Sequence, residues 1–191
     1  YYSDDIIGIF YTEAKYAFAL SGDWKLRTGL QYSDQSSNGD QLLKGTRFDS
    51  HQWGAKAELV RGGALFTAAY TDAGGNANMH NPWCGYPGYT SVQLEDFIRD
   101  GESAWMLRAG YDFASVKGLG VYALYVDGSD PSAPTEFARQ EADFNVQWKV
   151  PEGMFKGLMV RLRYAQVSQD DPASDDLKDL RIMVFYDPPS L

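Results

Sequence analysis

Cysteine, histidine and long apolar runs are all scarce in this chain of 191 residues. A single cysteine excludes an internal disulfide, and two histidines leave little material for a catalytic triad or a metal site. No stretch approaches the roughly 18 uninterrupted apolar residues that a membrane-spanning helix needs. The net charge of −9 argues against nonspecific binding to nucleic acid. These absences exclude a helical membrane protein and a basic nucleic-acid-binding module.

Aromatic residues are abundant instead, at 15% of the chain, while the mean hydropathy is only −0.40. Apolar and polar residues alternate, as residues 24–32 show. Trp24, Leu26, Leu30 and Tyr32 share one face of an extended strand, opposite Lys25, Arg27 and Gln31. Aromatics and leucines opposite basic residues, repeated strand after strand, indicate a sheet with lipid on one side and water on the other.

Nine segments carry strand patterns. They are Ile7–Leu20, Trp24–Tyr32, Ser50–Val60, Ala64–Thr71, Ala104–Phe113, Val121–Val126, Ala142–Val150, Leu158–Val167 and Leu180–Tyr186. The first segment is mixed in polarity, and Val121–Val126 is apolar on both faces, so its faces stay unassigned. Short turns at 21–23, 62–63, 114–120 and 151–157 alternate with long polar connections at 33–49, 72–103, 127–141 and 168–179. This contrast between the two ends of a meander is typical of outer-membrane barrels.

Aromatic spacing supports a membrane barrel. Trp24 and Tyr32 lie eight residues apart on one face, as do Trp105 and Phe113. In a tilted strand this spacing corresponds to roughly 20 Å along the membrane normal, close to the separation of two aromatic girdles. A soluble sandwich with an aromatic core is the alternative, but it would rarely carry Trp or Tyr at both ends of its core strands.

An odd number of strands places the two ends of the chain at opposite ends of the sheet. Single-chain bacterial barrels usually have an even number of strands and both termini in the periplasm. No basic, apolar-cored leader precedes Tyr1. We therefore expect residues 1–191 to be the C-terminal half of a barrel, with residues 1–5 in an extracellular loop and an upstream half as partner.

Charge is distributed unevenly along the chain. Most of the 26 acidic residues fall in the four long connections, and Asp170, Asp171, Asp175, Asp176 and Asp179 form the densest group. The inferred inward faces, counted from the second strand, hold only the acids Glu58, Asp112 and Asp143 against eight basic residues. The basic residues are Lys25, Arg27, Lys56, Arg108, Lys149, Arg161, Arg163 and Arg181.

A wall with excess positive charge lowers the energy of a partly dehydrated anion. Arg161 and Arg163 project in the same direction about 6.6 Å apart, so an anion could pass from one guanidinium to the next. The alternative for any one arginine is that it pairs with a neighbouring carboxylate and fills the lumen. That alternative is weaker for the group, because basic residues outnumber the acids.

The long connection 72–103 contains Pro82-Trp83-Cys84 and Pro87-Gly88-Tyr89-Thr90-Ser91. These motifs, with Gly101-Glu102, Ala104-Trp105, Tyr111-Asp112-Phe113, Arg161-Leu162-Arg163-Tyr164-Ala165 and the strand around Arg181, resemble the OprD-type porins of Gram-negative bacteria. The resemblance covers most of this chain but only the second half of a family member. It implies an all-β transmembrane barrel of 18 antiparallel strands, passive uptake of carboxylates and amino acids, and inward-folded loops that form a constriction.

By this resemblance Arg161, Arg163, Arg181 and Arg108 belong to a row of basic residues on the wall, and Tyr89, Ser91 and Asp96 lie near the constriction. Two positions depart from the family pattern. Cys84 stands where a small residue is common, and residues 187–191 follow the last aromatic residue instead of the chain ending there. The second departure puts recognition by the barrel-assembly machinery in doubt.

Enzyme chemistry has little support in the sequence, and we expect no cofactor, catalytic residue or metal site. Asp49, Ser50 and His51 are consecutive in a strand, so they alternate faces and cannot converge. His80 and Cys84 alone make a weak metal site. The leading prediction is a channel for small anionic or zwitterionic solutes in the bacterial outer membrane. An outer-membrane anchor whose acidic loops bind a protein partner is the alternative, and the solute and the oligomeric state stay open.

Overall fold

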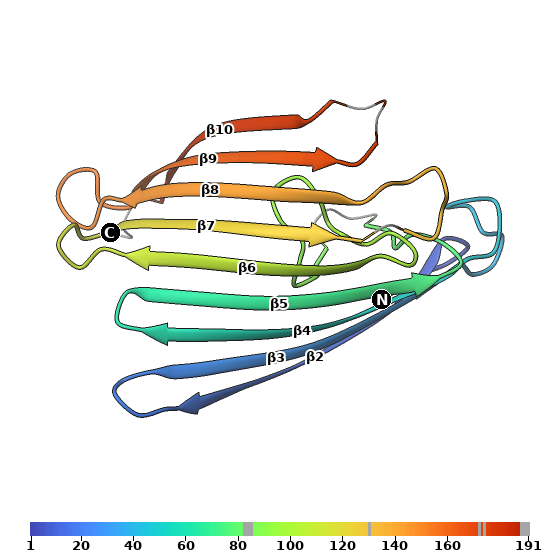
Figure 1. Cartoon of the computed structure of the whole chain (residues 1–191), viewed down its shortest axis with the longest axis horizontal. Coiled ribbons are helices and arrows are strands. Elements are labelled where there is room, and N and C mark those ends of the chain that lie inside the picture. The colour runs from blue at the N-terminus through green and yellow to red at the C-terminus, as the bar shows by residue number, and fades with distance from the viewer. Residues whose placement is uncertain (82–85, 130, 172, 174, 188–191) are drawn as a thin grey trace.

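The computed structural model describes residues 1–81, 86–129, 131–171, 173 and 175–187. Ten strands form one antiparallel sheet in which every strand pairs with its neighbours in sequence (Figure 1). They are β1 (Tyr2–Ser3), β2 (Ile7–Ala19), β3 (Lys25–Ser36), β4 (Asp49–Arg61), β5 (Ala64–Gly75), β6 (Ser103–Asp112), β7 (Leu119–Gly128), β8 (Arg139–Lys149), β9 (Leu158–Gln169) and β10 (Leu177–Tyr186). Within these described ranges, no helix has the length and apolar character needed to cross a membrane.

The all-β antiparallel meander is confirmed, and the nine long strands, β2 to β10, correspond to the nine predicted segments. The additional strand, β1, is a two-residue pairing of Tyr2–Ser3 with the start of β2. Several strands extend further into the polar connections than their apolar residues indicate. β3, for example, pairs with β4 as far as Ser36 and Asp49, because backbone hydrogen bonds continue wherever a partner strand is present.

The connections differ between the two ends of the sheet (Figure 1). At one end the chain turns at 20–24, 62–63, 113–118 and 150–157, and at the other it forms the connections 37–48, 76–102, 129–138 and 170–176. We call these the short-turn end and the long-loop end. The 170–176 connection is no longer than the turn at 150–157, because β9 and β10 extend into the predicted loop. The two edge strands of the nine, β2 and β10, both run towards the short-turn end.

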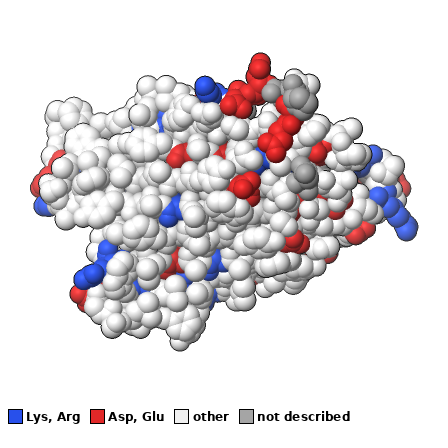
Figure 2. Space-filling view, in the orientation of Figure 1, with Lys and Arg blue, Asp and Glu red and all other residues white. Residues whose placement is uncertain are grey.

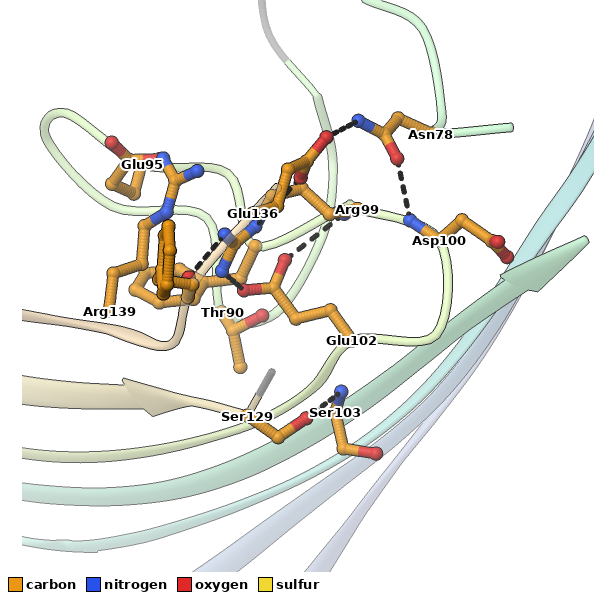
Figure 3. A network of polar contacts seen from close by, with 12 residues as sticks. Asn78, Thr90, Glu95, Arg99, Asp100, Glu102, Ser103, Ser129, Glu136 and Arg139 are labelled. Carbon is orange, nitrogen blue, oxygen red and sulfur yellow. Dashed lines mark hydrogen bonds and ion pairs between the residues drawn. The ribbon is translucent and has the colours of Figure 1, made fainter. Parts of the chain in front are cut away.

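Strand register fixes which side chains share a face. Glu58 pairs with Thr67, Thr67 with Arg108, and Arg108 with Leu124, so all four project from the same side. The sheet is curved, and the 76–102 connection packs against this side on the inner part of the curve (Figure 3). We call this side the loop-covered face and the opposite side the bare face.

The bare face presents large apolar side chains along its strands, including Trp53, Trp105 and Ile182, which are 43%, 40% and 73% exposed. Near the long-loop end, tyrosines direct their hydroxyls towards a polar residue two positions further along the strand. Tyr70 Oη lies 3.5 Å from Asp72 Oδ2, and Tyr164 Oη lies 3.3 Å from Gln166 Oε1. An aromatic ring on apolar surroundings with its hydroxyl at a polar boundary is the arrangement of aromatic belts at membrane interfaces.

Buried apolar residues lie mostly where the 76–102 connection covers the sheet. Phe97, Met106 and Val126 form a cluster there, and Leu124 packs against it. This cluster explains why the predicted segment Val121–Val126 is apolar on both faces. Leu124 and Val126 belong to the loop-covered face but are apolar because they contact the loop instead of water.

Candidate functional site

The 76–102 connection is fastened to the loop-covered face by hydrogen bonds from several strands. The Gln52 amide donates from Nε2 to the Phe97 carbonyl over 3.0 Å, and the hydroxyls of Thr71 and Thr90 lie 2.6 Å apart. On β8 the buried Glu141 carboxylate accepts hydrogen bonds from the backbone N–H groups of Leu94 (2.9 Å) and Glu95 (2.8 Å). A buried carboxylate is costly unless it is bonded in this way, so the loop and the strand residue satisfy each other.

A network of charged groups holds the base of the same connection (Figure 3). The side chains of Arg99 and Glu102 form an ion pair and are only 8% and 0% exposed. Arg99 Nη1 also donates to the Phe137 carbonyl over 2.7 Å, and the Asn78 amide donates to Glu136 Oε1 over 3.1 Å. The 76–102 connection is thus tied to the 129–138 connection beside it.

Tyr89 connects the loop to β2. Its hydroxyl donates to Glu13 Oε1 on β2 over 2.8 Å, and Lys56 Nζ lies 4.7 Å from the centre of its ring. Burial, followed by the hydrogen bond to the Glu13 carboxylate, raises the pKa of Tyr89 above its ordinary value. The hydroxyl therefore stays protonated and acts as a donor. Gly29 on β3 makes room for it, because a Cβ at that position would collide with the Tyr89 hydroxyl.

Substitution of Gly29 by alanine is therefore expected to push Tyr89 away from Glu13 and Lys56. The loss of one hydrogen bond and one cation–π contact should lower the stability of the folded protein by about 1–2 kcal/mol. The midpoint of thermal unfolding measures this effect, and it is read from gels as the temperature at which the band of the folded form disappears. Gly8→Ala on the bare face is the matched control, since a Cβ there makes only ordinary van der Waals contacts, the nearest with Ser36 Oγ at 3.7 Å. Equal stability of the two variants would contradict the arrangement.

A cavity of about 430 Å³ opens beside Tyr89 on the loop-covered face. Four basic side chains, Lys15, Lys56, Arg108 and Arg163, line it together with the loop residues Tyr89 and Ser91, and Lys15 is paired with Glu13 at 2.7 Å. The remaining lining residues are Tyr11, Glu13, Glu58, Thr67, Pro87, Gly88, Val92, Met106, Tyr122, Leu124 and Asp143. The cavity therefore offers both cationic and anionic groups to a small solute.

A second cavity, of about 410 Å³, lies towards the short-turn end and is lined by Arg108, Arg161, Asp112, Tyr122 and Gln147 among others. Arg108 and Tyr122 line both cavities. A third cavity, of about 380 Å³, includes Arg27 and Lys56. By register all eight predicted basic residues project from the loop-covered face. Lys25, Lys149 and Arg181 share that face but line none of these three cavities.

The three predicted constriction residues are placed differently. Tyr89 and Ser91 line the first cavity, whereas Asp96 does not. Asp96 accepts hydrogen bonds from the Ser91 hydroxyl and, over 3.4 Å, from the Asn81 amide, so it orders the loop behind the cavity. Cys84, together with Pro82 and Trp83, lies outside the described residues. In the described part of the chain, no group of three or more His, Cys, Asp and Glu residues could hold a metal ion.

Sequence reasoning missed three acids and two basic residues on the loop-covered face. Glu13 and Lys15 lie on the mixed first strand, while Arg139, Glu141 and Asp179 were assigned to loops although β8 and β10 include them. The excess of basic residues is therefore smaller than the sequence predicts. Extending the alternation of Asp143 and Asn145 back by two residues would have placed Glu141 on the same face.

His80 occupies the long-loop end of the site. Its ring packs edge-on against Phe48 at 4.7 Å between centroids, and its backbone N–H donates to Gln35 Oε1 over 2.7 Å. Burial and, secondarily, the charge of Lys44 lower the pKa of His80 below its ordinary value of 6.5. Protonation of His80 would place a charge against Phe48 near Lys44.

Stability of the protein should consequently decrease as the pH falls from above 6.5 through the lowered pKa of His80. The unfolded chain takes up the proton at a higher pH than the folded chain, so protonation favours unfolding. Midpoints of thermal unfolding between pH 8 and pH 5 measure this dependence, and His80→Gln should flatten it. An unchanged slope in the variant would show that other groups cause the dependence.

Comparison with known proteins places this geometry in a family. The sequence model described as "outer membrane porin, OprD family" matches residues 2–189. Among curated protein sequences, none matches the chain significantly.

Solved structures of Pseudomonas aeruginosa proteins share the fold. OpdK with vanillate is 21% identical, has a TM-score of 0.85, and matches 95% of this chain and 49% of its own. OccK3 (OpdO) is 23% identical, with a TM-score of 0.84, and matches 96% of this chain and 50% of its own. OccK5 (OpdH) is 23% identical, with a TM-score of 0.83, and matches 95% of this chain and 50% of its own.

The chain thus spans about half the length of these structures. The family match over residues 2–189 agrees with the apolar bare face, its aromatic rings and the polar face beneath the folded loop. The chain belongs to the OprD family of outer-membrane porins, and its place is the bacterial outer membrane.

Proposed function

We propose that this chain forms the C-terminal half of an 18-stranded barrel through which small anionic or zwitterionic solutes, such as carboxylates and amino acids, diffuse passively. The cavity beside Tyr89 carries the proposal, because it brings Lys56, Arg108 and Arg163 together on the face opposite the apolar one. Cationic groups in a narrow aqueous passage lower the barrier for an anion that sheds part of its hydration shell.

The mixed charge of the cavity favours a solute that also bears a cationic group. Glu13, Glu58 and Asp143 line it beside the four basic residues. The ammonium group of such a solute can donate hydrogen bonds to these carboxylates. Its carboxylate can accept paired hydrogen bonds from the guanidinium groups. OpdK has been determined with vanillate. A carboxylate of that kind is one of the solutes we expect to enter this cavity.

Removal of three of the four cations of the first cavity should reverse the charge preference of the channel. The triple variant Lys56→Gln, Arg108→Gln, Arg163→Gln leaves Glu58 and Asp143 uncompensated, while Lys15 still pairs with Glu13, so cations should become the favoured ions. Reversal potentials of the full-length protein in planar bilayers under a salt gradient measure the preference, and the sign should change. Lys178→Gln, on the bare face, is the control and should leave the potential unchanged. A cation preference in the unmodified protein would overturn the proposal.

The alternative function is an outer-membrane anchor whose acidic loops bind a protein partner. Acidic side chains cluster at the β9–β10 connection, where Asp170, Asp171, Asp175 and Asp176 lie (Figure 2). This alternative requires negligible conductance, together with binding that is lost when these four aspartates are neutralised. The channel proposal requires conductance that survives the same change.

A further inference from the structure

Basic residues on the loop-covered face differ in the kind of partner that holds them. Lys56 Nζ lies 3.5 Å from Glu58 Oε1, and Arg181 Nε lies 2.7 Å from Asp179 Oδ1. In each of these ion pairs an acid fixes the position of the cation. The acid also cancels most of the charge that a passing anion would experience.

Arg108 and Arg161 are held by uncharged groups instead. The Arg108 guanidinium lies over the Tyr122 ring, with Cζ 4.0 Å from the ring centre. Arg161 donates from Nε and Nη2 to Gln147 Oε1, over 3.1 and 2.7 Å. Within the ranges that the structure describes, neither arginine forms an ion pair with an acidic side chain.

Both arrangements lie at the first and second cavities described above. Arg108 and Tyr122 line the cavity beside Tyr89 as well as the one nearer the short-turn end, while Arg161 and Gln147 line the latter. Asp112 is the one acid among the described lining residues of the second cavity. Its carboxylate Oδ1 is turned towards Gly120, where a Cβ would collide with it. A solute moving between the cavities therefore passes Arg108 and Arg161, neither of which is ion-paired to a described carboxylate.

We propose that Tyr122 and Gln147 are positioning residues. They hold Arg108 and Arg161 on the solute path without cancelling their charge, so that these two arginines set the preference for anions. A ring face or an amide oxygen restricts the orientation of a guanidinium as an acid does, but adds no negative charge. The inference rests on the proposed channel function and assigns a role to two residues outside the basic row.

Gln147→Glu tests the role of Gln147 with little change in shape. The new carboxylate should hold Arg161 at least as firmly and cancel its charge. The anion-to-cation permeability ratio of the full-length protein in planar bilayers should fall about threefold, as for a charge removed from the pore wall. Gln166→Glu makes the same chemical change on the bare face and should leave the ratio unchanged.

Tyr122 is tested by a pair of variants that separate the ring from the hydroxyl. Tyr122→Phe keeps the ring face and should behave as the unmodified protein. Tyr122→Leu releases Arg108 but keeps its charge, so the acetate concentration that half-saturates conductance should rise about fivefold. If Tyr122 had only a structural role, the phenylalanine and leucine variants would have the same affinity for acetate. Heat-resistant mobility in gels establishes that each variant is folded.

Two results are decisive against the inference. If the unmodified channel prefers anions but Gln147→Glu and Tyr122→Leu both behave as it does, Tyr122 and Gln147 have no positioning role. If the unmodified protein conducts no ions or prefers cations, the proposed function itself is wrong, and the positioning role is wrong with it. Because Gln147→Glu preserves the size of the side chain, it tests the inference even if Tyr122→Leu does not fold.

Discussion

Glu102→Ala should destabilise the folded protein by about 3–5 kcal/mol, the usual cost of leaving one partner of a buried ion pair uncompensated. Arg99 would keep its hydrogen bond to the Phe137 carbonyl, and its Nε would keep Glu136 Oε2 at 3.9 Å, but it would lose the carboxylate that is completely buried beside it. The Arg99 backbone N–H would also lose its acceptor, Glu102 Oε2 at 3.0 Å. Thermal unfolding of the full-length protein measures the loss.

The pair formed by Arg139 and Glu95 provides the matched control. It joins the same two kinds of side chain in the same region (Figure 3), but its members are 21% and 23% exposed. Glu95→Ala should therefore cost less than about 1 kcal/mol, because water solvates the charge that remains. Replacement of both buried partners by Arg99→Met and Glu102→Leu should cost less than Glu102→Ala alone, since no buried charge is left without a partner. Equal losses for Glu95→Ala and Glu102→Ala would contradict this account.

Glu141→Ala should release the middle of the 76–102 connection from the sheet. The backbone N–H groups of Leu94 and Glu95 would lose their acceptor, which is buried between loop and strand. Two unsatisfied buried donors cost about 2–6 kcal/mol if the loop stays in place, so we expect it to move instead. Single-channel conductance should increase, because the loop would no longer fill the inner side of the sheet.

Gln140→Ala is the control for this variant. It changes the neighbouring residue on β8, whose side chain projects from the bare face, and should leave conductance unchanged. Glu141→Gln should give an intermediate result, since the amide oxygen can still accept one hydrogen bond while the amide nitrogen meets a second donor. Unchanged conductance in Glu141→Ala would show that the remaining contacts, such as that of Thr71 with Thr90, hold the loop without it.

The sequence was sufficient to predict the strands and the two faces, because a period of two survives wherever a strand separates lipid from water. It was not sufficient at positions where the 76–102 connection packs against the sheet. Leu124 and Val126 are apolar on the polar face because Phe97 and its neighbours cover them, and no pattern within the strand shows this. Glu141 looked like a loop residue because acids are common in loops. Its partners, Leu94 and Glu95, are distant in sequence.

The candidate site was predicted in composition but not in arrangement. Lys56, Arg108, Arg163, Tyr89 and Ser91 were all named from the sequence, and the structure brings them to one cavity. The sequence could not show that Arg108 and Arg161 have uncharged partners whereas Lys56 and Arg181 have acidic ones. The partners of the two arginines depend on the register of β6 with β7 and of β8 with β9. Asp96, predicted near the constriction, does not line this cavity but accepts a hydrogen bond from Ser91, which does.

The parallel course of β2 and β10 limits what can close this sheet into a cylinder. Each exposed edge needs a neighbour that runs the opposite way if the barrel is to stay antiparallel throughout. A second copy inserted in the same orientation presents only its own β2 and β10, so both seams would be parallel. An odd number of additional strands satisfies both seams at once. Two copies in the same orientation would therefore leave the ring mismatched at both seams.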